Sequence, residues 1–261
     1  MDFNETIITR EIIKAFDGKL LESLEGDVLI AGAGPSGLVA GYYLAREGFQ
    51  VTIIEKRLSP GGGVWGGGMA MNEVVVQESA ASIVKEFGIR MKPSGTGGLF
   101  CIDSMEMGSA LCLRALHAGV HIFNLMCVED VCVNGNRVTG LVVNRTTLLG
   151  NFPVDPIMFK AGAVLDSTGH EAAVVQIMRK HGYKILSPTG EMIGEGAMDA
   201  PAGEAFVEER TGEVYPGLFV SGMAVCATFG GPRMGPIFGG MLLSGKKVAS
   251  LIHARLKTAS P

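Results

Sequence analysis

The chain has 261 residues, of which 47% are hydrophobic and 18% are charged, and its formal net charge is −4. This length allows one large core, and the absence of a basic cluster beyond Lys246-Lys247 argues against nucleic-acid binding. No apolar run approaches the roughly 20 residues of a membrane-spanning helix, and five cysteines without CxxC spacing are typical of reduced thiols, so we expect a cytoplasmic protein that binds no membrane.

Residues 1–26 predict a leading helix. Within this segment Ile8, Ile12, Phe16 and Leu20 recur at helical spacing, which indicates that one face of the helix is apolar. The segment is mixed and charged rather than basic and then apolar, so we do not expect a secretory signal.

A glycine-rich turn follows the first predicted strand, residues 28–31. Gly32, Gly34 and Gly37 form a GxGxxG pattern, in which the first glycine permits a tight turn and the second lets the backbone approach a pyrophosphate. The third lets the following helix pack closely on the strand. Glu55 closes the next strand, roughly 20 residues further on, where an acid accepts hydrogen bonds from an adenosine ribose. This unit predicts a dinucleotide site and leaves open whether NAD or FAD binds, as cofactor or as substrate.

Residues 61–68 form a second glycine cluster. So many residues without Cβ favour backbone packed against the nucleotide or a neighbouring chain, although a mobile loop has the same composition.

The rest of the chain alternates between helical and strand-like periodicity. In chain order the expected elements are helix 77–87, helix 105–118, strands 121–123, 128–133 and 138–143, strand 163–166, helix 171–181, strand 217–220 and helix 238–256. A hairpin is expected around residues 134–136. This order predicts a single α/β domain over residues 1–261, with a Rossmann-like dinucleotide-binding fold of the FAD/NAD-binding type and an inserted small β layer.

Two segments lack clear periodicity. Residues 144–160 carry Gly150, Pro153 and Pro156 and predict a shaped loop. Residues 187–211 are rich in glycine and acidic residues and predict a surface loop.

Three residues in turn-forming surroundings are candidates for chemistry. Asp155, before a proline, and His170, just past a strand, are residue types that bind a divalent metal such as Fe(II), and two protein ligands would leave positions open for substrate. Asp-Pro is also common in turns, and a histidine after a strand often caps the next helix, so both interpretations stay open.

Arg233 lies among prolines and glycines, a frame in which a guanidinium needs an anionic partner. That partner is either a carboxylate or phosphate of a substrate, or an acidic residue of the chain itself. The remaining histidines are interpreted as structural, and they are His117, His121, His181 and His253.

Taken together, these stretches resemble the thiamine thiazole synthase family, in particular its archaeal and bacterial sulfide-dependent branch, which has also carried the name ribose 1,5-bisphosphate isomerase. The motifs that carry the resemblance span nearly the whole chain and lie at residues 32–38 (GAGPSGL), 55–63 (EKRLSPGGG), 154–156 (VDP), 168–170 (TGH), 221–226 (SGMAVC) and 233–245.

The resemblance implies a transferase of thiamine biosynthesis that consumes NAD as a substrate. Nicotinamide is lost, the opened ADP-ribose tautomerises to a ketone, glycine condenses through its amine, and sulfur enters before cyclisation. The product is ADP-5-ethyl-4-methylthiazole-2-carboxylate.

The resemblance also assigns residues. With the glycines of the turn, the nucleotide site comprises Gly32, Gly34, Ser36, Gly37, Glu55, Lys56, Gly63, Val128, Pro153, Val154 and Met223. Asp155 and His170 would hold Fe(II), and Arg233 would bind the glycine carboxylate. The loop 152–155 would reach into a neighbouring subunit's site, in a ring-shaped homo-octamer.

One departure from the family pattern concerns the sulfur source. Fungal and plant relatives place a sacrificial cysteine two residues before this aspartate, and archaeal relatives often have histidine, whereas this chain has Pro153. No cysteine lies between residues 144 and 160, so free sulfide is the expected donor. A second departure is Arg145, where relatives often carry tryptophan.

Three other functions stay open. The glycine turn, the ribose acid and the late strand near residues 217–223 also resemble those of FAD-dependent oxidoreductases, although the chain is short for a separate substrate domain. The isomerase is a second alternative. The third is an inactive NAD-binding relative, in which Pro153 marks the loss of activity.

Overall fold

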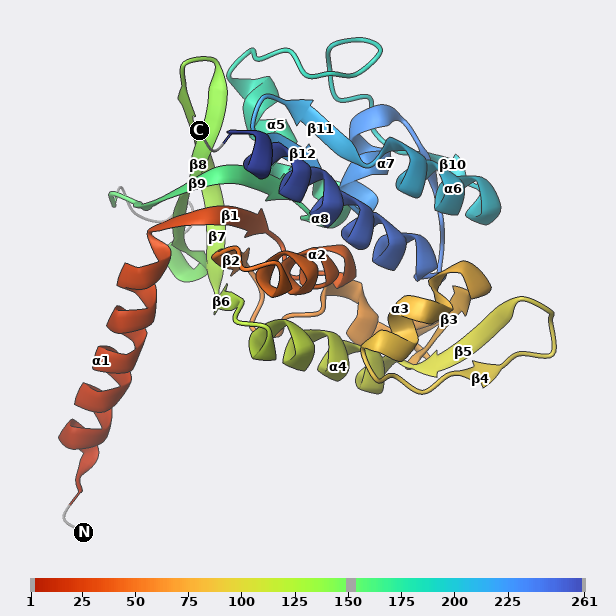
Figure 1. Cartoon of the computed structure of the whole chain (residues 1–261), viewed down its shortest axis with the longest axis horizontal. Coiled ribbons are helices and arrows are strands. Elements are labelled where there is room, and N and C mark those ends of the chain that lie inside the picture. Colours follow the sequence, from red (N-terminus) through yellow and green to blue (C-terminus); the bar gives the residue numbers. More distant parts are fainter. Residues whose placement is uncertain (1–2, 149–153, 260–261) are drawn as a thin grey trace.

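A mostly parallel sheet of eight strands forms the centre of the molecule (Figure 1). The computed structural model describes residues 3–148 and 154–259. The strands of this sheet are β1 (Glu25–Ala31), β2 (Val51–Glu55), β6 (His121–Asn124), β7 (Met126–Asn134), β8 (Arg137–Arg145), β9 (Ile157–Asp166), β11 (Gly212–Tyr215) and β12 (Leu218–Val220). Their order is β11-β12-β9-β1-β2-β6, and the predicted hairpin β7-β8 joins antiparallel to β9. The predicted α/β dinucleotide-binding fold is confirmed.

The parallel strands end together at one edge of the sheet. Ala31 at the end of β1 pairs with Ile54 of β2 on one side and with Asp166 of β9 on the other. The turn after β1, Glu55 and the segment after β9 therefore meet at the same edge, where ligands of such folds bind.

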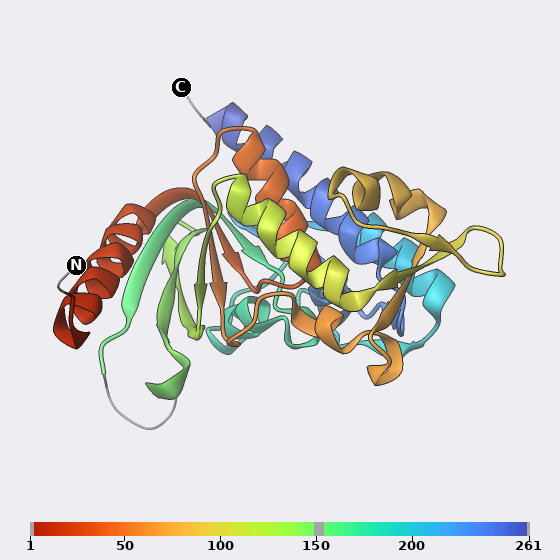
Figure 2. The ribbon, with the colours of Figure 1, turned by 90° about the horizontal axis from the view of Figure 1, so that it is seen from below.

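Eight α-helices lie among the described residues, and they cover both faces of the sheet. They are α1 (Glu5–Ser23), α2 (Pro35–Arg46), α3 (Ala81–Glu86), α4 (Ser104–His117), α5 (Ala173–Lys180), α6 (Ala200–Arg210), α7 (Met223–Phe229) and α8 (Gly239–Ala259). Figure 2 shows α2, α4 and α8 side by side on one face, while α5, α7 and the hairpin lie on the other. None of the helices in residues 3–148 and 154–259 is long and apolar enough to cross a membrane.

The core consists of two large apolar clusters, one on each face of the sheet, and a small third cluster of Val207, Met223, Cys226 and Met234. Strand β1 supplies both large clusters, because alternate side chains of a strand point to opposite faces. Val28 and Ile30 belong to the cluster under α2, α4 and α8, whereas Leu29 and Ala31 belong to the cluster under α5 and α7. The continuous burial of β2, and of β1 from Val28 to Ala31, is typical of parallel strands that are covered on both sides.

Two small sheets complete the fold. Strands β3 (Glu73–Gln77), β5 (Leu99–Asp103) and β4 (Lys92–Pro93) form an inserted antiparallel layer, and β10 (Gly196–Met198) pairs in parallel with β13 (Pro232–Arg233). The sequence pattern predicts none of these strands individually. The helix expected over residues 77–87 is shorter, because Gln77 belongs to β3 and α3 begins only at Ala81.

The prediction of a surface loop over residues 187–211 is wrong for the second half of this segment, where α6 forms. Asp199 caps this helix by accepting a hydrogen bond from the Ala202 N–H, and Pro201 lies in its first turn, where a missing N–H costs nothing. Gly203 is not a loop glycine, since an added Cβ would come within 2.8 Å of the Pro232 carbonyl oxygen. It is a close-packing position between α6 and β13.

The loop expected over residues 144–160 is also shorter than predicted. Strand β8 continues to Arg145 and a short 3-10 turn, η4, covers Thr146–Leu148, while β9 already begins at Ile157. Pairing of Val143 with Ile157 extends the ladder into the predicted loop from both sides. Residues 149–153, which include Pro153, lie outside the described residues.

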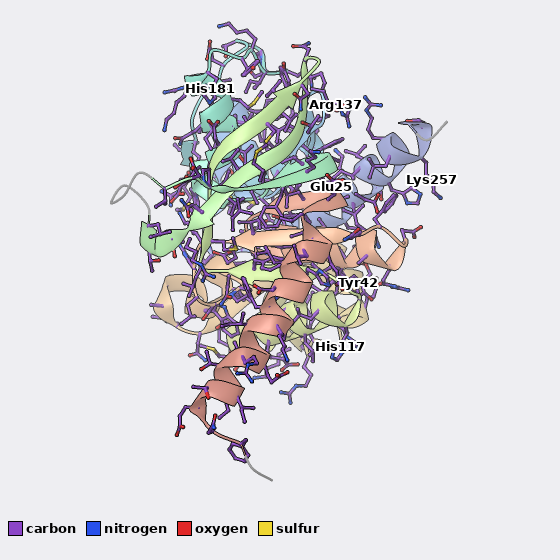
Figure 3. All side chains as sticks on the ribbon, turned by 90° about the vertical axis from the view of Figure 1, so that its left-hand side faces the viewer. Glu25, Tyr42, His117, Arg137, His181 and Lys257 are labelled. Atoms are coloured by element: carbon purple, nitrogen blue, oxygen red, sulfur yellow. The ribbon has the colours of Figure 1, made fainter. Side chains whose placement is uncertain are left out.

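The leading helix is confirmed as α1, but only part of its apolar face is covered. Phe16 packs edge-on against Phe123, with ring centroids 5.9 Å apart, and Leu20 packs on the same cluster. Toward its N-terminus the helix extends beyond the rest of the chain (Figure 3). There Ile8 is 47% exposed and Ile12 is 64% exposed.

Candidate functional site

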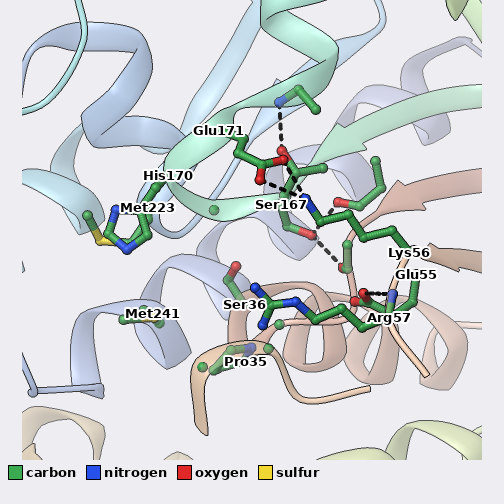
Figure 4. A pocket seen from close by; sticks show the side chains of 18 of the residues that line it. Pro35, Ser36, Glu55, Lys56, Arg57, Ser167, His170, Glu171, Met223 and Met241 are labelled. Atoms are coloured by element: carbon green, nitrogen blue, oxygen red, sulfur yellow. Dashed lines mark hydrogen bonds and ion pairs between the residues drawn. The ribbon is translucent and has the colours of Figure 1, made fainter. Parts of the chain in front are cut away.

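A cavity of about 360 Å³ opens at the edge of the sheet where β1, β2 and β9 end (Figure 4). Segments that are distant in sequence line it, among them the glycine turn, the end of β2, the second glycine cluster, the start of β7, the segment after β9 and the start of α7. Of the residues assigned from the sequence, those in its wall are Gly32, Gly34, Ser36, Glu55, Lys56, Gly63, Val128, His170 and Met223.

The glycine turn closes tightly against the end of β9. Gly32 has φ +96°, and a Cβ there would lie 2.5 Å from the Ser167 carbonyl oxygen. A Cβ at Gly37 would lie 2.2 Å from the Gly32 carbonyl oxygen, so the helix can approach the strand only without a side chain at this position. Gly34 has no such neighbour and borders the cavity. As the N-cap of α2 it offers no side-chain acceptor, which leaves the first N–H groups of the helix for an anion.

Residues of the second glycine cluster pack against the glycine turn that follows β1. A Cβ at Gly62, which has φ +59°, would lie 3.1 Å from the Gly34 Cα, and Gly62 and Gly63 both line the cavity. The cluster forms two 3-10 turns, η1 (Gly62–Gly66) and η2 (Gly68–Ala70). Backbone therefore packs on backbone beside the cavity at this point.

Glu55 is buried at the end of β2 and held by the backbone. One carboxylate oxygen accepts a hydrogen bond from the Ala33 N–H and the other from the Arg57 N–H, each at 2.8 Å. Because a carboxylate oxygen can accept more than one hydrogen bond, both retain capacity for a sugar hydroxyl. The carboxylate is thus pre-oriented at the cavity wall.

Two cations follow Glu55, and they differ in their surroundings. The Lys56 ammonium lies 2.7 and 2.6 Å from the two carboxylate oxygens of Glu171, so its charge is compensated. The Arg57 side chain extends across the cavity toward Ser36 (Figure 4), and it forms no ion pair within residues 3–148 and 154–259. Arg57 is a functional candidate that the sequence analysis missed, although an arginine next to the ribose acid is a known signal for phosphate binding.

A buried carboxylate shapes the turn that presents His170. Asp166 accepts hydrogen bonds from the Thr168 N–H and hydroxyl and from the N–H groups of Val174 and Val175, at 2.7 to 3.0 Å. Burial raises the pKa of Asp166, and these hydrogen bonds oppose the shift. The segment between Thr168 and Val174 includes the 3-10 turn η5 (Gly169–Glu171). His170 therefore lies on a turn whose two flanks are hydrogen-bonded to Asp166.

Glu195, which the sequence analysis also missed, connects His170 with Arg233. One of its oxygens lies 2.6 Å from His170 Nδ1, and the other lies 3.6 Å from Arg233 Nε. Arg233 is not in the cavity wall, and its side chain is 53% exposed. The internal ion pair considered for Arg233 is therefore present, at a distance longer than that of a hydrogen bond. Glu195 stands between two glycines in the sequence, which gives no signal of its role.

Asp155 is not brought to the cavity within one chain. Val154 and Asp155 are exposed and absent from the cavity wall, and Pro153 lies outside the described residues. Within residues 3–148 and 154–259, no group of three or more histidine, cysteine or acidic residues is arranged to hold a metal. His170 is thus the one assigned metal ligand that the cavity contains.

The other histidines are distant from the cavity wall. His121 contacts the Ser23 hydroxyl, His181 contacts Asp130, and His253 pairs with Glu47. None of these residues lines the cavity.

Two cysteines lie near the site as buried or partly buried thiols. Cys127 lines the cavity, and burial raises the pKa of its thiol while Lys56 partly opposes that shift. Burial raises the pKa of Cys226 to about 12, and its Sγ lies 3.2 Å from the Pro232 carbonyl oxygen that accepts its hydrogen bond. Both thiols are therefore protonated at neutral pH.

Comparison with known proteins gives matches over nearly the whole chain. The model of the Thi4 family matches residues 9–238. Proteins named thiamine thiazole synthase from Methanothermobacter thermautotrophicus and Thermotoga maritima are 48% and 49% identical to this chain over 259 residues, covering 98% of it and 100% of each relative. The crystal structure of Thermovibrio ammonificans THI4 superposes with a TM-score of 0.95 at 48% identity, covering 98% of this chain and 100% of that one.

Proposed function

Because the chain belongs to the Thi4 family, we propose that it synthesises the thiazole precursor of thiamine from NAD, glycine and sulfide. In this reaction the glycosidic bond of NAD breaks and nicotinamide leaves. The opened ADP-ribose tautomerises to a ketone, the amine of glycine condenses with it, and sulfide enters before the ring closes to an adenylated thiazole carboxylate. The observation that carries the proposal is one cavity that joins a dinucleotide turn to His170, with Arg233 beside it.

The nucleotide end of the cavity supports NAD as the substrate. Glu55 is fixed to receive the ribose hydroxyls, and the bare N-terminus of α2 is suited to the diphosphate. Arg57 adds at the same place a cation that has no ion pair in the part of the chain that the structure describes.

The residues at the other end fit Fe(II). The Nδ1 atom of His170 is engaged by Glu195, and its Nε2 atom has no partner within the described residues, which leaves one imidazole nitrogen for a metal. The exposed carboxylate of Asp155 is the second ligand and would come from a neighbouring copy. Fe(II) held by these two groups would supply Lewis acidity and open positions for substrate and sulfide.

Arg233 is proposed to bind the carboxylate of glycine. Its Nε atom lies 3.6 Å from Glu195, and the guanidinium forms no second ion pair with another residue within residues 3–148 and 154–259. A fork of two N–H donors matches a carboxylate in geometry and charge. The bound glycine would then lie near His170, because both side chains contact the same glutamate.

Free sulfide is proposed as the sulfur donor. The thiol in the cavity wall, Cys127, and the buried thiol of Cys226 are both held in the protonated form, which is a poor nucleophile. A donor that arrives with each turnover allows the protein to act repeatedly.

Self-association into a ring-shaped octamer, as the resemblance implies, would complete the site with a residue from a neighbouring copy. The N-terminal half of α1 and the residue Phe3 before it expose large apolar side chains, which in the helix are Ile7, Ile8, Ile12 and Ile13. Such exposure is typical of a surface that another chain covers. We therefore propose a homo-oligomer, with an octamer as its specific form, in which each site receives Asp155 from a neighbour.

The test is an anaerobic incubation of the purified protein with Fe(II), NAD, glycine and sulfide, followed by mass spectrometry. We expect free nicotinamide and repeated formation of the adenylated thiazole carboxylate, both dependent on added sulfide. Omission of glycine is the control, because the ring then lacks its nitrogen. Intact NAD after prolonged incubation would contradict the proposal and favour an inactive relative.

Two further observations separate the alternatives. A yellow protein that releases FAD on denaturation would favour an oxidoreductase. Conversion of ribose 1,5-bisphosphate, with no thiazole formed from NAD, would favour the isomerase.

A further inference from the structure

We propose that Glu195 is a positioning residue that couples the metal ligand His170 to the glycine-binding Arg233. The inference rests on the proposed function, because it assigns a role to a residue beside the proposed iron and glycine sites. The two carboxylate oxygens of Glu195 face different partners. One lies 2.6 Å from His170 Nδ1, and the other lies 3.6 Å from Arg233 Nε.

The contact with His170 determines which imidazole nitrogen can bind a metal. A carboxylate oxygen only accepts hydrogen bonds, so Nδ1 must carry the proton and donate it. The lone pair of the ring is then on Nε2, the nitrogen without a partner in the described part of the chain. A carboxylate behind a ligating histidine also fixes the ring orientation and raises its basicity as a ligand.

The contact with Arg233 orients the guanidinium through its Nε edge. A contact through Nε leaves the two Nη groups as donors for another partner. The carboxylate of a substrate can bind there with two parallel hydrogen bonds. Glu195 therefore orients both His170, which would bind the metal, and Arg233, which would bind glycine.

The backbone holds Glu195 in place from both sides. The Gly194 N–H donates to the Ala227 carbonyl at 2.9 Å, and the Gly196 N–H donates to the Gly231 carbonyl at 2.8 Å. Strand β10, which begins directly after Glu195, pairs in parallel with β13, which contains Arg233. The glutamate side chain is only 16% exposed, so its position is set by this ladder rather than by solvent.

Two substitutions separate the two contacts. Glu195→Ala removes both, and we expect the affinity for Fe(II) to fall by about 10- to 100-fold, as for other carboxylates behind metal-binding histidines. Glu195→Gln retains one acceptor for His170 Nδ1–H but turns amide donors toward Arg233 Nε–H. We therefore expect Glu195→Gln to recover much of the metal affinity and to keep an increased KM for glycine.

The measurements do not depend on turnover alone. Fe(II) affinity is measured anaerobically by competition with a chromophoric chelator, and Co(II) absorption bands report ligand geometry in each variant. NAD affinity is measured by calorimetry, and kcat and KM for glycine are determined separately. The matched control is Glu191→Gln in the same segment, where the carboxylate pairs with Lys184 and does not line the cavity.

The outcomes distinguish the inference from the proposed function. Fe(II) affinity and glycine KM in Glu195→Ala equal to those of the unmodified protein would overturn the inference. An equal loss of NAD affinity and melting temperature would overturn it too, because the residue would then be structural. Unchanged Co(II) bands in Glu195→Ala count against the contact with His170.

If the unmodified protein binds metal, and Glu195 variants alter that binding, but no thiazole forms, the proposed function fails while the coupling to His170 stands. A protein that binds neither Fe(II) nor Co(II) overturns both.

Discussion

The two ends of the cavity are built in different ways. At the nucleotide end, Gly32, Gly37 and Glu55 lie within one βαβ unit, where Gly37 packs on the Gly32 carbonyl and the Ala33 N–H donates to Glu55. At the other end, His170, Glu195 and Arg233 come from three separate segments, and side chains rather than backbone connect them. The first end can be recognised from a local motif, whereas the second exists only after the chain has folded.

The two ends also differ in how complete they are within one chain. Glu55 is buried and both of its oxygens are occupied by N–H groups. His170 and Arg233 are each more than half exposed, and Asp155 lies outside the cavity wall. The nucleotide end is ready to bind in a single chain, and we expect the other end to be completed by metal, substrate and a neighbouring copy.

The largest expected effect is at the metal end. Either His170→Ala or Asp155→Ala should abolish iron-dependent turnover and leave NAD affinity close to that of the unmodified protein, because neither residue touches the nucleotide turn. Product formation by mass spectrometry and NAD binding by calorimetry check this. Equal loss of nucleotide binding in both variants would count against the metal assignment.

Mixing the His170→Ala and Asp155→Ala variants tests whether the metal end of the site takes Asp155 from a neighbouring copy. If Asp155 serves a neighbour's site, subunit exchange should create sites with both native ligands. Random assembly of equal amounts gives such ligand pairs in about a quarter of the sites, with matching recovery of activity. Mixing His170→Ala with itself after the same treatment is the control, and no recovery in the mixed sample would mean that each site uses ligands from one chain.

Arg233→Ala should have the next largest effect. Loss of a charge-assisted contact costs about 1.5–3 kcal/mol, which corresponds to an increase of about 10- to 100-fold in the glycine requirement. The steady-state KM for glycine, with NAD saturating, is the measurement. An unchanged glycine dependence would remove Arg233 from the site.

A smaller effect is expected at the nucleotide end, where Arg57 and Lys56 can be compared directly. Arg57→Gln should weaken NAD binding by about tenfold, since its guanidinium lines the cavity without an ion pair in the described part of the chain. The double variant Lys56→Gln/Glu171→Gln keeps the net charge and should bind NAD nearly as well as the unmodified protein, because that pair is already internally compensated. Calorimetric titration with NAD gives both values, and the reverse order would assign the phosphate contact to Lys56.

The smallest effect concerns the thiol at the nucleotide end. Burial raises the pKa of Cys127 above the ordinary value of 9.0, so the reactive thiolate is scarce at neutral pH and increases only as the pH rises beyond that value. Alkylation of Cys127 by iodoacetamide, followed by peptide mass spectrometry, should be slow at pH 7, faster at alkaline pH, and slower again with NAD bound. Fast labelling at neutral pH that NAD does not affect would place Cys127 outside the nucleotide site.

Much of the fold can be predicted from local sequence patterns. The predictions that are wrong also come from local patterns. The strand, turn and acid around Gly32 and Glu55 were recognisable because each has a fixed spacing and a steric reason. The glycine-rich and acidic composition of residues 187–211 predicts a loop where α6 forms, because composition does not show that Gly203 permits close packing on β13 or that Pro201 lies in the first turn. The strands of the small sheets are too short to produce a clear period.

The sequence by itself determined the dinucleotide unit, the order of the main elements and the position of His170 at the end of a strand, because these depend on contacts between residues close along the chain. Tertiary structure alone decided that Lys56 is paired while Arg57 has no ion pair among the described residues, that Glu195 lies between His170 and Arg233, and that the apolar face of α1 is left partly open. The physical reason is that the distance between side chains from remote segments is set by how helices and sheets pack, and no local spacing in the sequence encodes it.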